Sequence, residues 1–136
     1  MKPTVTFIIP VGEEQEFLIE QINAVFKFSE NYGGFCEIIM PIDKLNHPKI
    51  DLALLAIKLN KITHPHVRAR PIYYTHETSL EDLIENSLNR AFGEKVIIVL
   101  NTTANIEKIQ KNGYTDKEII ITKYVLDFSI LEGMLN

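Results

Sequence analysis

The pattern of apolar and polar positions predicts short strands that alternate with helices along the chain. Runs rich in β-branched residues and bounded by Gly, Pro or Asn are typical of buried strands. Apolar residues spaced three and four apart are typical of helices packed on one face. Strands are predicted over 4–11, 35–42, 67–74, 95–100 and 118–123, and helices over 13–29, from Pro48 onward, over 79–91, over 106–111 and over 125–135. This alternation predicts an α/β three-layer sandwich with a mainly parallel sheet.

Prolines and caps refine the ends of these elements. We expect Pro41 to end strand pairing, because proline has no backbone N–H to donate, and Pro71 to place its strand near the sheet edge. Ser79, followed three residues later by Asp82, resembles a capping box, and Gly93 is expected to be the C-terminal cap of the same helix.

Asn46, His47 and Pro48 are typical of a helix start, and the helix that follows is predicted to bury one apolar stripe. Pro48 suits the first helical position because no backbone donor is needed there. The stripe is expected to consist of Leu52, Leu55, Ala56, Leu59 and Ile62.

Composition restricts the class of protein. The chain has 136 residues, 46% of them hydrophobic and 24% charged, which predicts one globular domain over 1–136. Its net charge of −4, with scattered Lys and Arg, argues against nucleic acid as a partner. No apolar run has the length of a transmembrane helix, and the N-terminus lacks the order of a signal peptide, so a cytoplasmic location is expected. The single cysteine, Cys36, is interpreted as a buried core residue.

Three stretches, in order, resemble the family 2 glycosyltransferases of the GT-A fold. TVTFIIPVGEEQEFL is similar to the family's opening strand and turn, and FCEIIMPID to its second strand, which closes in aspartate. SLEDLIENSLNRAFGEKVIIVLNTT is similar to the run that leads into the metal-binding D-x-D motif. The resemblance covers about the first 110 residues. It implies a short GT-A-type domain, restricted to the nucleotide-binding half, that binds a nucleotide or nucleotide sugar.

The chain departs from the family at the D-x-D position, where Leu100, Asn101, Thr102 and Thr103 stand. Neutral oxygens are poor ligands for Mg²⁺ or Mn²⁺, which favour carboxylates. No cofactor is therefore assigned, and Mn²⁺ or Mg²⁺ would bind only if its ligands came from outside this position. The resemblance implies a transferase activity that is degenerate or independent of metal, and it assigns no catalytic base.

The resemblance implies a nucleotide pocket lined by Val11, Gly12, Asp43 and the turn formed by Asn101, Thr102 and Thr103. Open α/β sheets also bind ligands at the carboxyl ends of their strands. For each polar residue an ordinary structural role stays open. Asp43 is either a ligand to the nucleoside or a solvated turn residue, and the Asn-Thr-Thr turn either contacts phosphate or ends a buried strand.

Other polar residues favour structural roles. Glu13 and Glu14 suit the first turn of a helix, where the dipole favours negative charge. The four histidines, His47, His64, His66 and His76, have no partner at a recognised ligand spacing, so surface or capping positions are expected.

The apolar C-terminal segment, 124–135, either closes the sheet of its own chain or supplies a homodimer interface. This segment supports an alternative function, a non-catalytic interaction protein that oligomerises on the same scaffold.

Overall fold

The computed structural model describes residues 4–11, 18–43, 48–74, 79–100, 117–122 and 133, and the description below is confined to them. Strands and helices alternate through most of this part of the chain. Their order is β1 (Val5–Ile8), α1 (Leu18–Asn31), β2 (Cys36–Asp43), α2 (Pro48–Thr63), β3 (Arg68–Tyr74), α3 (Leu80–Arg90), β4 (Lys95–Val99) and β5 (Glu118–Thr122). The predicted helices over 106–111 and 125–135 lie outside the described residues.

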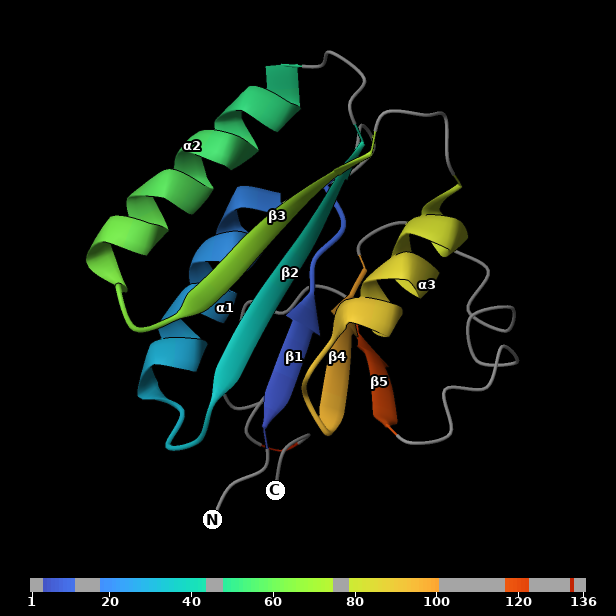
Figure 1. Ribbon diagram of the computed structural model, residues 1–136. Helices are drawn as coiled ribbons and strands as arrows, with labels where there is room; N and C mark the ends of the chain where they lie inside the picture. Colours follow the sequence, from blue (N-terminus) through green and yellow to red (C-terminus); the bar gives the residue numbers. More distant parts are fainter. Residues whose placement is uncertain are drawn as a thin grey trace.

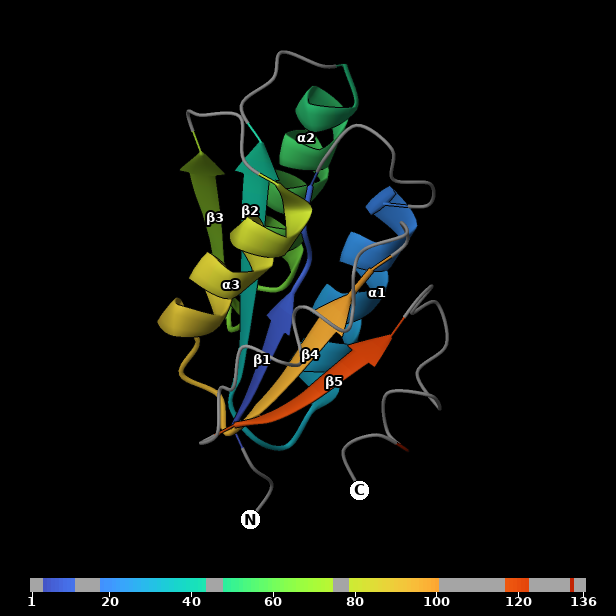
Figure 2. The same cartoon turned by 90° about the vertical axis from the view of Figure 1, so that its right-hand side faces the viewer.

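The five strands form one sheet in the order β3-β2-β1-β4-β5, and every pairing is parallel. Helices α1 and α2 cover one face of the sheet and α3 covers the other (Figures 1 and 2). The predicted α/β architecture with a parallel sheet between helical layers is confirmed. The described helices include none that is long and apolar enough to cross a membrane.

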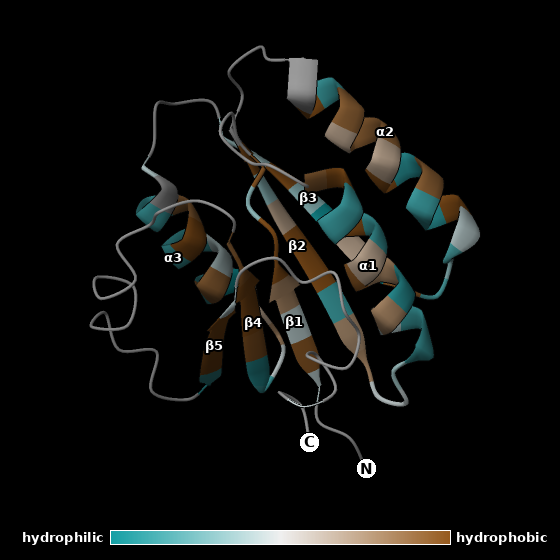
Figure 3. Ribbon diagram, turned by 180° about the vertical axis from the view of Figure 1, so that it is seen from behind, coloured by the Kyte–Doolittle hydropathy of each residue, from teal (hydrophilic) through white to brown (hydrophobic). Residues whose placement is uncertain are grey.

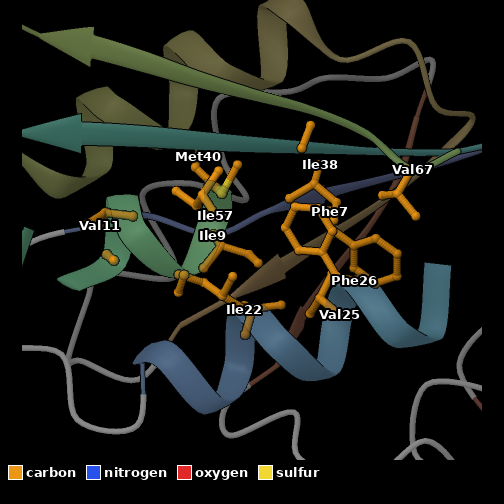
Figure 4. Close-up of a cluster of buried hydrophobic side chains, with 14 of the residues drawn as sticks. Phe7, Ile9, Val11, Ile22, Val25, Phe26, Ile38, Met40, Ile57 and Val67 are labelled. Carbon is orange, nitrogen blue, oxygen red and sulfur yellow. The ribbon is translucent and has the colours of Figure 1, made fainter. Parts of the chain in front are cut away.

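Each face of the sheet has its own apolar core. The larger core joins β1, β2 and β4 to α1 and α2, and Figure 4 shows Phe7 and Phe26 at its centre. The smaller core lies under α3 and includes Ile84 and Leu88. The central strands are buried on both faces and are mostly apolar, as the largely brown colour of β1, β2 and β4 in Figure 3 shows, with Thr6 and Glu37 as buried polar exceptions. Cys36 is buried in the larger core, as predicted.

Of the two predictions for proline, one is confirmed and one is wrong. β3, which contains Pro71, is an edge strand as predicted. The prediction that Pro41 ends strand pairing is wrong, because β2 remains paired with β3 through Asp43. Pro41 faces β1 with its carbonyl, which accepts a hydrogen bond from the Val11 N–H at 2.9 Å. The regular β1–β2 ladder stops at Ile8 and resumes as a single bridge between Val11 and Ile42. Pro41 therefore interrupts the pairing of β2 with β1 only locally.

The predicted buried stripe of α2 is also wrong. α2 begins at Pro48, as predicted, but Leu52, Leu55, Leu59 and Ile62 are 53 to 75% exposed. The stripe that packs on the sheet consists of Ile50, Ala53, Ala56, Ile57 and Asn60, so Ala56 alone was assigned correctly. α2 lies beside α1 and β3, near the sheet edge, where small residues allow close approach while the leucines point outward.

The cap prediction for α3 is right at one end and wrong at the other. Ser79 is the N-cap, and its hydroxyl accepts a hydrogen bond from the Asp82 N–H. The C-cap is Ala91, not Gly93. Gly93 is instead required by close packing. A Cβ there would lie 2.5 Å from the Thr6 nitrogen and 2.7 Å from the Lys95 carbonyl oxygen.

A buried polar network fixes the amino ends of the strands. Glu37, 1% exposed, accepts hydrogen bonds from the Thr6 hydroxyl at 2.9 Å and from the Phe92 N–H at 3.1 Å. Its other oxygen pairs with the Arg70 guanidinium. The Thr6 hydroxyl also accepts a bond from the Gly93 N–H at 2.8 Å. Strands β1, β2 and β3 are thereby joined to the segment that follows α3.

Candidate functional site

The strand order reverses between β1 and β4. From β1 the chain adds β2 and β3 on one side, and then returns through α3 to place β4 and β5 on the other. Ligands of open α/β sheets bind outside the carboxyl ends of the strands at such a switch point. The candidate site is therefore the edge of the sheet where β1, β2 and β4 end.

Two of the predicted site residues meet at this edge. Val11 bridges to Ile42, the residue before Asp43, and Asp43 is the last residue of β2. The Val11 side chain is 1% exposed and lies in the larger core (Figure 4), and its N–H is used by the Pro41 carbonyl. Val11 can therefore meet a ligand only through its backbone carbonyl, whereas the backbone of Asp43 stands at the strand end beside Tyr74 of β3.

The β4 side of the site is fixed up to Leu100. The Leu100 N–H donates a 2.8 Å hydrogen bond to the Thr122 carbonyl, and its side chain is fully buried. Ile98 of β4 pairs with Ile8 of β1, so β4 ends beside the end of β1. Gly12 and the Asn101, Thr102 and Thr103 turn lie outside the described residues, as do Glu13 and Glu14.

The sequence-based reasoning missed one polar residue near this edge, Gln21. It is 1% exposed, and its amide nitrogen has no hydrogen-bond partner among the described residues. α1 turns Asn23 and Phe26 toward α2, where they contact Asn60 and His64. Because successive helical residues are about 100° apart, Gln21 lies on the side of α1 away from α2. A polar residue one turn before Val25 on an apolar stripe was the available signal in the sequence.

Gln21 lies in the first part of α1, which starts at the carboxyl ends of the strands (Figure 1). A second buried polar atom without a partner, the Tyr74 hydroxyl, belongs to the last residue of β3. Leaving a buried donor unpaired costs about 1–3 kcal/mol. A polar ligand that forms a hydrogen bond with either group would therefore remove this cost and stabilise the complex.

The described residues offer no metal site of the usual kind. In the ranges given above, no three His, Cys, Asp or Glu side chains are grouped so that they could hold an ion. His64 follows the end of α2, where its ring contacts the Glu30 carboxylate and stacks on Phe26. His66 is exposed, and His47 and His76 lie outside the described residues.

Comparison with known proteins gives structural likeness alone. No family model matches the chain, and no curated protein matches it. Among solved structures, a mannosyltransferase from Pyrobaculum calidifontis, in complex with GDP-mannose and Mn²⁺, matches with a TM-score of 0.54 at 20% identity, over 69% of this chain. The match spans only 26% of that enzyme. A universal stress protein from Archaeoglobus fulgidus matches with a TM-score of 0.51 at 8% identity, over 86% of this chain and 92% of its own.

These two likenesses establish a fold and leave the chemistry open. At 20% and 8% identity, neither likeness establishes an activity for this chain, because one fold serves many functions. The first agrees with the GT-A resemblance of the sequence, and the second shares nearly its whole length with the present chain.

Proposed function

We propose that this chain binds a nucleotide or nucleotide sugar at the carboxyl edge of the sheet. Val11, Gly12, Asp43 and the Asn101, Thr102 and Thr103 turn line the proposed site. The single observation that carries the proposal is the parallel order β3-β2-β1-β4-β5, because it brings the end of β1, the end of β2 and the residue before Asn101 to one switch point. The GT-A resemblance and the solved mannosyltransferase with bound GDP-mannose support it.

The donor set of the site favours hydrogen bonding over metal chemistry. Asparagine and threonine offer amide and hydroxyl groups that bond phosphate or sugar oxygens without a cation. A divalent ion adds several kcal/mol of transition-state stabilisation in metal-assisted transfer, and this turn provides no carboxylate for it. We therefore propose binding with weak, metal-independent glycosyl transfer or none. No residue is assigned as the base.

Thermal unfolding in the presence of nucleotides tests the proposal. UDP, GDP, UDP-glucose and GDP-mannose are titrated with and without Mn²⁺. Ligand at 100 times its dissociation constant stabilises a protein by about 2.7 kcal/mol when it binds only the native state. We expect a saturable rise in Tm with at least one nucleotide, and the same rise without Mn²⁺. A flat Tm with all four would contradict the proposal.

Variants at the site locate the binding. Asp43→Ala and Thr102→Ala are expected to weaken affinity about tenfold each, which corresponds to about 1.4 kcal/mol. Gln21→Leu removes the unpartnered buried amide, so it should raise the stability of the free protein while weakening the ligand-induced shift. Glu30→Gln, at the other end of α1, is the matched control and should bind as wild type does. Affinity that is unchanged in all three site variants would place the ligand elsewhere.

A second candidate function rests on one observation. Four large apolar side chains on α2 are more than half exposed, which is typical of a protein–protein contact. They favour an interaction protein that oligomerises on this scaffold without catalysis. Dimerisation together with no response to any nucleotide would support this candidate over the first.

A further inference from the structure

The outward face of α2 forms a continuous apolar seam, defined here as Leu52, Leu55, Leu59 and Ile62. Their exposed fractions are 54, 53, 55 and 75%. A surface helix of a globular protein normally turns polar residues, not a row of large apolar ones, toward solvent. α2 buries only the face that packs on α1 and the sheet, so its second apolar face lacks cover in the described part of the chain. Figure 3 shows hydrophobic segments along the whole of α2.

The spacing of the seam specifies the kind of partner. Its members are three, four and three residues apart, which is the a/d spacing of a coiled coil. The buried face has the same spacing at Ile50, Ala53, Ile57 and Asn60. Side chains in such a narrow row fit into the gaps of a second helix crossing at a small angle. A flat or irregular partner surface would have no gaps that match this spacing.

We propose that the seam pairs with the seam of a second copy of this chain, with the two α2 helices antiparallel about a two-fold axis. In this arrangement Leu52 meets Ile62 of the second copy, and Leu55 meets Leu59 of the second copy. The two-fold axis makes each of these two contacts occur twice, as an isologous interface requires. The pairing is independent of the proposed nucleotide site.

Charge on α2 selects the antiparallel direction. Asp51 is exposed in the first turn and Lys61 in the last. Antiparallel helices bring each aspartate to the end that carries the lysine of the other copy, whereas parallel helices would bring like charges together. The helix dipoles also favour the antiparallel pair. Lys58 flanks the centre of the seam, where its stem can cover apolar surface and its ammonium can reach solvent.

A seam of four side chains buries less than a standard interface, so a weak dimer is expected, with a dissociation constant of about 1–100 μM. Sedimentation of the full chain over this range tests it. Leu55→Glu with Leu59→Glu should abolish the dimer, and circular dichroism should show that the variant stays folded, since both side chains are half exposed. Phe92→Ser, at an exposed aromatic residue outside α2, is the matched control and should keep the dimer.

Cysteine cross-linking tests the direction. A mixture of Leu52→Cys and Ile62→Cys chains should cross-link at least tenfold better than either chain alone, and the native Cys36 does not interfere because it is buried. Asp51→Lys should weaken the dimer severalfold, and adding Lys61→Asp should restore it. A chain that stays monomeric at about 100 μM overturns the proposal. A dimer that survives the two glutamates also overturns it, and would implicate another surface such as 124–135.

Discussion

Gly93→Ala is expected to be strongly destabilising, although it adds a single methyl group. The new Cβ would lie 2.5 Å from the Thr6 nitrogen, about 0.9 Å inside the 3.4 Å limit of ordinary contact. It would also lie 2.7 Å from the Lys95 carbonyl oxygen. Both atoms are backbone of paired parallel strands, so neither can rotate away. The segment before β4 must shift, or β1 and β4 must separate.

The magnitude follows from two costs. Overpacking a tight site costs about 1–3 kcal/mol. A shift also breaks the 2.8 Å bond from the Gly93 N–H to the buried Thr6 hydroxyl, and a buried group left unpaired costs about 1–3 kcal/mol. We expect a loss of about 4 kcal/mol of unfolding free energy, a large share of the 5–15 kcal/mol typical of a domain.

Urea denaturation measures this loss, and a midpoint about 2 M lower than that of wild type is expected. Gly133→Ala is the control for adding a methyl group, because nothing lies within 4 Å of a Cβ there, and its unfolding free energy should be no lower than that of wild type. Thr6→Ala should not rescue Gly93→Ala, since it removes the hydroxyl contact and leaves both backbone contacts. A loss below about 1 kcal/mol, or a rescue by Thr6→Ala, would refute the close-packing argument.

Two further predictions concern buried polar groups. Glu37→Gln removes the charge that accepts from Arg70, Thr6 and Phe92, so we expect a loss of about 3 kcal/mol in urea denaturation. The exposed Glu30→Gln should cost less than about 1 kcal/mol, and equal losses would contradict the prediction. Burial, and then the charge of the Cys36 thiolate, raises the pKa of Tyr32 above 10.0, so its contribution to stability is complete below pH 10 and is lost as pH rises through the folded-state pKa. Unfolding free energy should therefore fall as pH rises above 10.0, and Tyr32→Phe should flatten that fall; an identical slope in the variant would contradict it.

The sequence predicted the order of strands and helices well, because local periodicity reports which residues are buried. It failed on α2, where two stripes have the same three-four-three spacing. The prediction took the stripe with the three leucines, Leu52, Leu55 and Leu59, while the core accepted the stripe that contains the smaller Ala53. Periodicity cannot say which of two equivalent faces meets the core. That choice depends on the space left between α1 and β3.

The failures at Pro41 and Gly93 have a different cause. Each depends on a neighbour distant in sequence: Pro41 on the Val11 N–H, and Gly93 on the Thr6 backbone. Rules based on neighbouring residues treat proline as a strand end and glycine as a helix cap, and they do not consider contacts with residues distant in sequence. The candidate site was predictable only to the level of its strand ends. Val11 and the backbone of Asp43 meet there, while the unpartnered Gln21 amide emerged only from the packing.

The two ends of the sheet are built from different chemistry, which separates stability from the proposed function. The buried charge of Glu37 lies at the amino ends of the strands, where its pairing with the partly exposed Arg70 joins β2, β3 and the segment before β4. At the carboxyl ends, the buried positions of the chain from β1, β2 and β4 are apolar up to Val11, Ile42 and Leu100. Substitutions beyond those three residues should therefore alter binding with little loss of stability, whereas substitutions in the amino-end network should lower the unfolding free energy. A ligand shift lost in a fully stable variant then reports on the site itself.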